Sequence, residues 1–202
     1  MNSNYLNEYI DLFERVLSVA CELKYSFRAV ERRISYSSLF RNIENSDHEL
    51  PLMILDKELI SDIYSDQRPI DLNKIPTYKQ CFWVAEAYLR IQGFSKLTFE
   101  AIFVYIPIKE MFHYFDIYHE MDFSQIIDEF NRLYASKSVL SIMLDRYEYT
   151  IKDVAEKLHV SYETIYSYKH RRRDIKKMEA KPAYELATLL RVRLETLLEL
   201  SL

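Results

Sequence analysis

A single glycine, Gly93, occurs in this chain of 202 residues, and its isolation constrains the fold more than any other feature. Hairpin turns and phosphate-binding loops need backbone angles with positive φ, which glycine adopts most readily. A chain with one glycine has few ways to build either of them. The sequence therefore predicts an all-α protein and argues against a glycine-rich nucleotide-binding loop.

Charge divides the chain into two parts. Residues 1–136 contain 14 Lys and Arg against 21 Asp and Glu, whereas residues 137–202 contain 13 against 10. The overall net charge of −4 is thus the sum of an acidic part and a basic part. We expect two domains, an acidic helical domain over residues 1–136 and a basic helical domain over residues 137–202.

Cysteine use and hydropathy indicate a cytoplasmic protein. The two cysteines, Cys21 and Cys81, lie in apolar helical patterns and form no CxxC motif, so we expect reduced thiols in the core. The first residues lack the basic and apolar segments of a signal peptide. No apolar run approaches the ~20 residues that span a bilayer, so no membrane association is expected.

Residues 1–136 contain several helical patterns. The apolar stripe of residues 5–23 predicts one amphipathic helix, and residues 122–135 predict another. Between them, Thr77 and Gln80 form a capping-box pair at the start of a further helix. Gly93 stands where the C-terminal cap of that helix is expected.

Residues 98–115 repeat the apolar spacing of a later segment, residues 150–160. Phe103 stands where the later segment has Ala155. Because a ring at this position would push two crossing helices apart, we expect residues 98–115 to form a core helical hairpin. A second, degenerate helix-turn-helix is the alternative interpretation.

The most specific pattern lies near the C-terminus. Thr150 and Asp153 form a capping box, and Ser161 precedes another helix as its N-cap. Ala155 is small where two helices must approach closely. His159 stands at a turn position that needs a left-handed residue. The spacing predicts two short helices that cross through a tight turn.

The outer face of the second of these helices, about residues 161–171, carries side chains suited to DNA. A helix fits into the major groove and presents its N-terminal residues to base edges. The candidate base readers are Tyr162, Glu163, Tyr166, Ser167 and His170. The candidate phosphate contacts are Ser161, Lys169, Arg171, Arg172, Arg173, Lys176 and Lys177. This local excess of positive charge is typical of phosphate contact, and a solvated charged face is the alternative interpretation.

Residues 137–200 resemble the lambda-repressor-like, Cro/C1-type (XRE) helix-turn-helix domain. The resemblance rests on three segments, residues 150–161, 164–168 and 186–198. It implies a five-helix DNA-binding domain, often dimeric, with its third helix in the major groove. Two departures stand out. His159 replaces the usual turn glycine, and residues 171–180 form a longer basic segment that could extend the recognition helix.

Patterns for catalysis or metal binding are weak. His113 and His119 are six residues apart, whereas metal pairs on one helix need a spacing of three or four. Glu110 and His113 have the Glu-x-x-His spacing of di-iron bundles but lack a second such pair. We therefore expect no enzyme activity, no metal and no cofactor, and an acid/base pair of His119 and Glu120 is the alternative.

Two functions remain open. The first is a sequence-specific transcriptional regulator of phage or toxin–antitoxin type, a homodimer that binds double-stranded DNA through residues 137–202. Residues 1–136 would then serve dimerisation or partner sensing. The second is a protein-interaction inhibitor, anti-defence or antitoxin-like, in which residues 1–136 bind a partner protein and the helix-turn-helix is autoregulatory or repurposed. The acidity of residues 1–136 supports the second, because an acidic surface can mimic nucleic acid.

Overall fold

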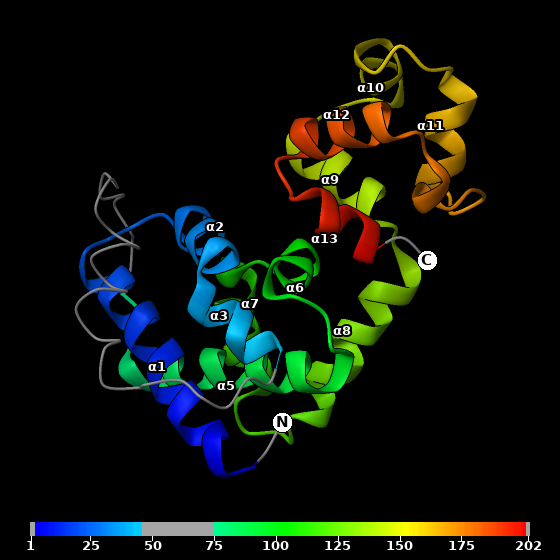
Figure 1. Cartoon of the computed structure of the whole chain (residues 1–202). Helices are drawn as coiled ribbons and strands as arrows, with labels where there is room; N and C mark the ends of the chain where they lie inside the picture. The colour runs from blue at the N-terminus through cyan, green and yellow to red at the C-terminus, as the bar shows by residue number, and fades with distance from the viewer. Residues whose placement is uncertain (1–2, 46–74, 201–202) are drawn as a thin grey trace. The chain divides into compact units, whose positions relative to one another are not determined.

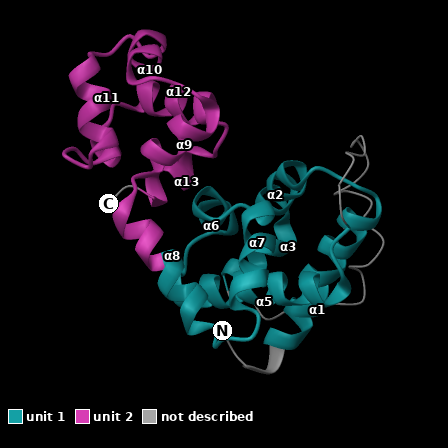
Figure 2. Cartoon of the chain, turned by 180° about the vertical axis from the view of Figure 1, so that it is seen from behind, with its two compact units in different colours: residues 1–130 teal, residues 131–202 magenta. Residues whose placement is uncertain are grey.

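The computed structural model describes residues 3–45 and 75–200, and every regular element in these ranges is helical (Figure 1). The predicted all-α class is confirmed for this part of the chain. The chain divides into two compact units, residues 1–130 and residues 131–202 (Figure 2). The division falls inside helix α8 (Ser124–Ser136), a little before the predicted boundary at residue 136. None of the described helices is long and apolar enough to cross a membrane.

Unit 1 is built around the pairing of two long helices, α1 (Ser3–Glu22) and α5 (Tyr78–Ser95). The stripe predicted over residues 5–23 forms α1. Shorter helices pack around this pair, and α2 contacts both α6 and α7. They are α2 (Phe27–Tyr36), α3 (Ser38–Glu44), α6 (Phe99–Tyr105) and α7 (Ile108–Tyr118).

The start of α5 agrees with the sequence prediction, whereas its end does not. The Gln80 amide donates to Thr77 Oγ1 at 3.3 Å, and the Thr77 amide donates to Gln80 Oε1 at 2.8 Å. The prediction that Gly93 caps this helix was wrong, because Gly93 lies inside it. Lys96, with φ 60°, adopts the left-handed conformation that closes the helix, and its amide donates to Gln92 O at 2.8 Å.

The core of unit 1 contains a cluster of five buried aromatic rings from four helices. Phe13 lies at the centre, with its ring centroid 5.0 Å from Phe40 and 5.6 Å from Phe99. Tyr88 stacks on Phe13 at 5.7 Å and meets Phe103 edge-on at 5.1 Å. Such ring pairs stabilise a core beyond the area they bury. The cluster fixes α6 between α1, α3 and α5.

Two glutamates cap the short helices of unit 1 from a distance in sequence. Glu44 Oε1 accepts the amide of Phe99, the first residue of α6, at 2.6 Å. Glu31 Oε1 accepts the amide of Ile108, the first residue of α7, at 2.7 Å. The second cap replaces a local one, because Pro107 stands at the N-cap of α7 and offers no side-chain acceptor.

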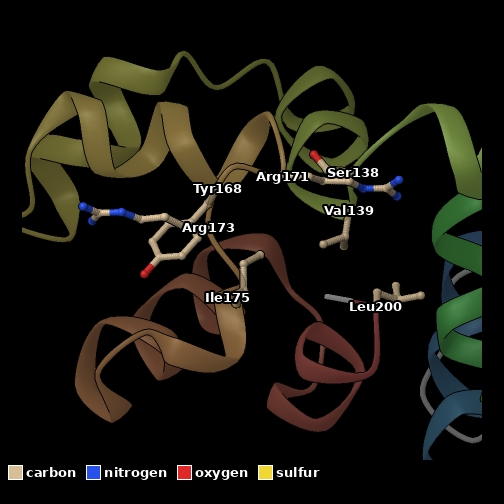
Figure 3. A pocket seen from close by; sticks show the side chains of 7 residues that line it. All are labelled: Ser138, Val139, Tyr168, Arg171, Arg173, Ile175 and Leu200. Carbon is tan, nitrogen blue, oxygen red and sulfur yellow. The ribbon is translucent and has the colours of Figure 1, made fainter. Parts of the chain in front are cut away.

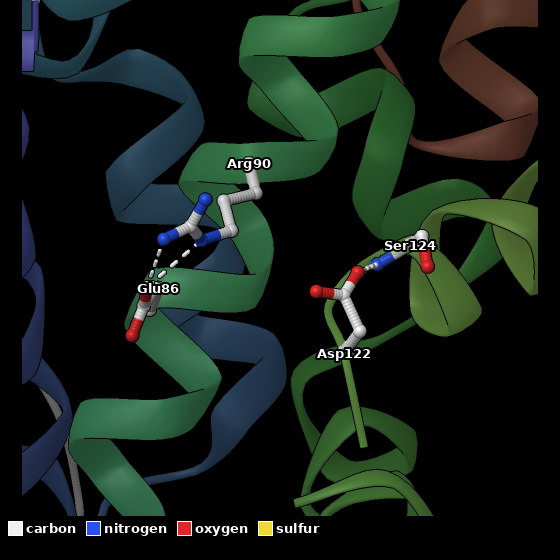
Figure 4. Close-up of polar contacts among 4 residues, drawn as sticks. All are labelled: Glu86, Arg90, Asp122 and Ser124. Carbon is white, nitrogen blue, oxygen red and sulfur yellow. Dashed lines mark hydrogen bonds and ion pairs between the residues drawn. The ribbon is translucent and has the colours of Figure 1, made fainter.

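Polar contacts lie on α5 and at the start of α8 (Figure 4). Asp122 Oδ1 accepts the Ser124 amide at 2.8 Å, and this hydrogen bond lowers the pKa of Asp122. On α5, Arg90 pairs with Glu86 at 2.6 Å. The same guanidinium lies 4.7 Å from the ring centroid of Phe123. Arg90 therefore joins the middle of unit 1 to the residues that begin α8.

Unit 2 continues from the end of α8 with a run of short helices. α10 packs against α11, α11 against α9, and α12 against both α9 and α13. A 3₁₀ turn, η2 (Ile175–Lys177), lies between α11 and α12. The α-helices are α9 (Val139–Tyr147), α10 (Ile151–Lys157), α11 (Tyr162–Lys169), α12 (Ala180–Leu190) and α13 (Leu194–Glu199).

Helices of unit 2 close on residues other than glycine. The left-handed positions, with φ from 52° to 56°, are Glu148, His159, Arg171 and Arg191. After α10, the Val160 amide donates to Ala155 O at 3.0 Å and the His159 amide to Glu156 O at 3.3 Å, which is the Schellman pattern. The left-handed conformation predicted for His159 is confirmed. A side chain in this conformation costs roughly 1 kcal/mol.

Candidate nucleic-acid interface

Local caps set the directions of α10 and α11. Thr150 and Asp153 form the predicted capping box, with the Thr150 amide 2.8 Å from Asp153 Oδ2 and the Asp153 amide 3.1 Å from Thr150 Oγ1. Ser161 caps α11 as predicted, since its Oγ accepts the Thr164 amide at 3.2 Å. Ala155 is buried where α10 faces its partner helix. All of these caps come from residues within three positions of their partners.

Three neighbouring rings run along α11 to its C-cap, the first pair stacked and the second tilted by 46°, and we name them the aromatic ladder: Tyr162, Tyr166 and His170. The centroids of Tyr162 and Tyr166 are 6.2 Å apart with an interplanar angle of 21°, and those of Tyr166 and His170 are 4.3 Å apart. Arg172 lies over Tyr166, with Cζ 5.2 Å from the ring centroid. Tyr162 remains 50% exposed despite the stacking. The four-residue spacing of the rings is visible in the sequence, whereas the position of Arg172 is not.

The other two predicted base readers differ in exposure. Glu163 is exposed in the first turn of α11, beside Tyr162. Ser167 is half-buried, and its carbonyl accepts the amides of Arg172 at 2.8 Å and Arg173 at 3.3 Å. These bonds turn the chain away from the helix axis, so the basic segment does not extend α11. Glu163 is thus exposed next to the first ring of the aromatic ladder, whereas the Ser167 carbonyl helps to end the helix.

A basic loop, residues 171–177, follows the aromatic ladder. Arg172, Arg173, Lys176 and Lys177 are exposed, whereas Ile175 is buried and holds the loop against the unit. Asp174 Oδ1 accepts the Lys176 amide at 2.9 Å and starts the 3₁₀ turn. The loop therefore presents its positive side chains from an anchored backbone. Two other predicted phosphate contacts lie on or beside α11: Lys169 is half-buried, and Ser161 is exposed at the N-terminus of the helix.

Arg171 is occupied by contacts inside unit 2. Its guanidinium donates to the carbonyl oxygens of Ala135 at 2.8 Å, Tyr134 at 2.6 Å and Lys137 at 2.7 Å. These carbonyls belong to the last turn of α8 and the residue after it, so Arg171 caps that helix. Its partners lie 34 to 37 positions away in sequence, and no local signal reveals them. We name this contact the α8 clasp.

The α8 clasp borders a small pocket of unit 2 (Figure 3). Within that view, the side chains of Arg171 and Arg173 point in opposite directions. Next to the clasp, Ser138 Oγ donates to Lys169 O at 2.6 Å. Two contacts therefore hold the end of α11 against the segment between α8 and α9. The pocket is lined by Ser138, Val139, Tyr168, Arg171, Arg173, Ile175 and Leu200.

The histidines of α7 and the residue after it have ordinary structural surroundings. His119 Nδ1 lies 2.8 Å from Phe115 O, and the His119 ring stacks on Phe115 with a centroid distance of 4.4 Å. His119 Nε2 lies 3.7 Å from the exposed carboxylate of Glu120. His113 is exposed on α7. Within the ranges that the structure describes, no three His, Cys, Asp or Glu side chains are placed to share a metal ion.

Comparison with models of known families, with curated proteins and with solved structures finds no significant match to this chain. In the described part of unit 2, the aromatic ladder and the basic loop bring aromatic and exposed basic groups together.

Proposed function

We propose that residues 137–202 form a lambda-repressor-like helix-turn-helix domain that binds double-stranded DNA, with α11 in the major groove. The observation that carries this proposal is the aromatic ladder on the exposed side of α11, directly followed by the basic loop. On this basis the protein is a cytoplasmic transcriptional regulator that binds as a homodimer. Residues 1–136 serve dimerisation or partner sensing.

The proposed roles follow from position. Tyr162, Glu163 and Tyr166 lie in the first turns of α11, the part of a recognition helix that meets base edges. Glu163 can accept a hydrogen bond from a cytosine amine, and the tyrosine rings can contact thymine methyl groups. His170 follows the end of α11, where it can contact DNA at the edge of the binding site. The N-terminus of α11, with Ser161, offers amide donors to a phosphate.

Arg173, Lys176 and Lys177 are the proposed phosphate contacts of the basic loop, because each is exposed and the loop backbone is anchored by Ile175. Arg172 supports Tyr166 and adds charge at the same edge. The guanidinium of Arg171 already binds three carbonyls, so we assign it a positioning role. Through the α8 clasp it holds the end of α11 in place.

Charge outside this surface restricts how DNA approaches. Residues 1–136 carry seven more acidic than basic residues, whereas residues 169–181 carry seven basic and two acidic ones. A polyanion is therefore repelled by most of the chain and attracted by the basic loop. This asymmetry favours productive orientation and makes binding steeply dependent on salt.

The test compares two triple variants that lose the same charge. The first is Arg173→Ala, Lys176→Ala and Lys177→Ala in the basic loop. The control is Arg32→Ala, Lys79→Ala and Lys109→Ala, three exposed residues of unit 1. Duplex affinity is measured by fluorescence anisotropy over a range of salt concentrations. Because each phosphate contact contributes a slope of about 0.9, we expect the loop variant to lose about 3 from the slope and the control to keep it. An unchanged slope in the loop variant contradicts the proposal.

The DNA for this test comes from selection of bound duplexes out of a random pool at physiological salt. Enrichment of a palindrome supports a dimer whose two α11 helices read two half-sites. The same titration is repeated with single-stranded competitor, because aromatic rings beside positive charge also suit unpaired bases. Stronger binding of the single strand contradicts duplex recognition. Enrichment of no sequence favours the alternative function, an inhibitor that binds a partner protein through residues 1–136.

A further inference from the structure

The only two cysteines of the chain meet in the core of unit 1. Cys21 lies in the last turn of α1, and Cys81 lies near the start of α5. Both are free thiols, with 1% and 0% of their surface exposed. The two thiols lie next to each other, and each affects the pKa of the other. Helix packing of α1 on α5 thus brings together two residues that are distant in sequence.

A short polar chain extends from this pair. The Ser18 hydroxyl donates to the carboxylate of Glu14 and lies beside the sulfur of Cys81. Glu14 is only 5% exposed, and burial raises its pKa. Buried polar groups on apolar helix faces cost stability unless they are paired. This chain of four side chains has no part in the proposed DNA surface, which lies in unit 2.

The two thiols are unequal. The pKa of Cys81 is lowered, chiefly by its contact with Cys21, whereas the same contact and burial raise the pKa of Cys21. Cys81 also lies four residues into an 18-residue helix, where the helix dipole favours a thiolate. Both effects favour Cys81 as the nucleophile of the pair. Cys21 is then the thiol that attacks the oxidised sulfur of Cys81.

We propose that Cys21 and Cys81 are a site of oxidative modification, at which a hydroperoxide converts the two thiols into one disulfide. The Cys81 thiolate attacks the terminal peroxide oxygen, an S–O bond forms, the O–O bond breaks, and the alcohol or water leaves with a proton. The sulfur of Cys21 then attacks the sulfenic sulfur of Cys81. The S–S bond forms, and the departing hydroxide takes the Cys21 proton as water. Two electrons pass from the thiols to the peroxide.

The product covalently joins the end of α1 to the start of α5. It closes a loop over residues 22–80, which restricts the unfolded chain and raises the midpoint of thermal unfolding. Both sulfurs are buried, so the peroxide reaches them when the terminal turn of α1 or α5 opens. Helix ends open more readily than helix centres, because they hold fewer hydrogen bonds.

The test oxidises the folded, full-length chain with hydrogen peroxide. Free thiols are then blocked, and the protein is examined by intact mass and peptide mapping. We expect the loss of both thiols, a mass lower by two hydrogens, a linked peptide pair containing Cys21 and Cys81, and a higher unfolding midpoint that dithiothreitol reverses. A gain of oxygen at either sulfur without linkage overturns the proposal, as does a disulfide that forms only in denaturant.

Single variants provide the control. Cys21→Ser and Cys81→Ser each remove one sulfur, and circular dichroism establishes whether each one folds. After peroxide, neither folded variant should show a reversible rise in unfolding midpoint, and a rise in either one overturns the proposal. The linkage map of the unsubstituted chain decides the question on its own if a variant fails to fold.

Discussion

Helices α6 and α7 of unit 1 start from the same local pattern as α10 and α11 of unit 2, yet the two pairs end in different environments. Thr98 caps α6 and Thr150 caps α10, with the amide of the third helical residue donating at 3.3 Å and 3.1 Å. Each first helix has seven residues. Every residue of α6 is buried, whereas in α10 only Val154 and Ala155 are. The same start thus yields a core helix in one unit and a surface helix in the other.

The connections between the helices explain the difference. In unit 1, Ile106 and Pro107 pass directly into α7, with Tyr88 Oη donating to Ile106 O at 2.8 Å and Glu31 capping the helix. In unit 2, residues 158–161 turn through left-handed His159, and Ser161 caps the next helix. The first connection depends on side chains from other helices. The second is specified almost entirely by its own residues.

The largest effect on stability is expected from replacing Phe103, the aromatic residue that stands in α6 where α10 has Ala155. Phe103 is 3% exposed and contacts Tyr88, so Phe103→Ala leaves a cavity and lowers the free energy of unfolding by about 3–5 kcal/mol. The reciprocal change, Ala155→Phe, overpacks α10 against α11 and costs about 1–3 kcal/mol. Urea unfolding measures both, and the fluorescence of Trp83, which lies in unit 1, reports the first. A smaller loss in the free energy of unfolding for Phe103→Ala than for Ala155→Phe would contradict the contrast between the core helix α6 and the surface helix α10.

The next largest effects on stability are expected at the N-terminal caps of α7 and α11, the second helix of each pair. Glu31→Ala leaves the buried amide of Ile108 without its carboxylate acceptor and should cost about 2–3 kcal/mol. Ser161→Ala removes an exposed local cap and should cost about 1 kcal/mol. Glu31→Gln keeps an acceptor oxygen and should fall between them. Urea unfolding gives the order, and equal losses for Glu31→Ala and Ser161→Ala would show that burial of the cap is unimportant.

The distinction between local contacts and contacts from distant residues also separates the features that the sequence predicted from those that it did not. Local signals were sufficient for the capping boxes at Thr77 and Thr150, for Ser161 and for left-handed His159. The helical class also followed from composition, because a chain with one glycine has few routes to hairpins. Prediction failed at Gly93, which lies within α5, since Lys96 adopts the left-handed angle.

Contacts between distant residues account for the rest. The capping of α7 by Glu31 and the α8 clasp of Arg171 join residues separated by 34 to 77 positions. No periodicity or local pair encodes such contacts, because they depend on how whole helices are placed. The candidate surface was therefore predictable as a set of residues on α11 and the basic loop. The contacts between its rings, and the hydrogen bonds of Arg171 inside unit 2, were not predictable.

Turn strain offers a gain in stability in place of a loss. His159→Gly removes the penalty of a side chain at φ 52° and should raise the free energy of unfolding by about 0.5–1 kcal/mol. Arg171→Gly relieves the same kind of strain at φ 55° but loses three hydrogen bonds to carbonyl oxygens, so it should destabilise unit 2. Urea unfolding followed by circular dichroism compares the two. A gain in both variants would show that the α8 clasp contributes little.

The smallest effect concerns the cap that α10 has and α6 lacks. Asp153 stands at the third position of α10, and its pKa is lowered because the Thr150 hydroxyl and amide donate to its carboxylate. In α6 the same position is Ala101, which cannot titrate. Since the pKa is lower in the folded chain, the box stabilises α10 above the pKa of an unfolded aspartate. That stability is lost as pH falls through the folded pKa.

An NMR titration of the Thr150 amide follows this loss directly, because that amide donates to Asp153 Oδ2. We expect its midpoint to lie below that of an ordinary aspartate, with the Thr164 amide at the Ser161 cap unaffected. Asp153→Asn removes the titration while keeping an acceptor oxygen. A midpoint at or above the ordinary value would show that the box does not hold the carboxylate, and the start of α10 would then depend on the Thr150 hydroxyl alone, as α6 depends locally on that of Thr98.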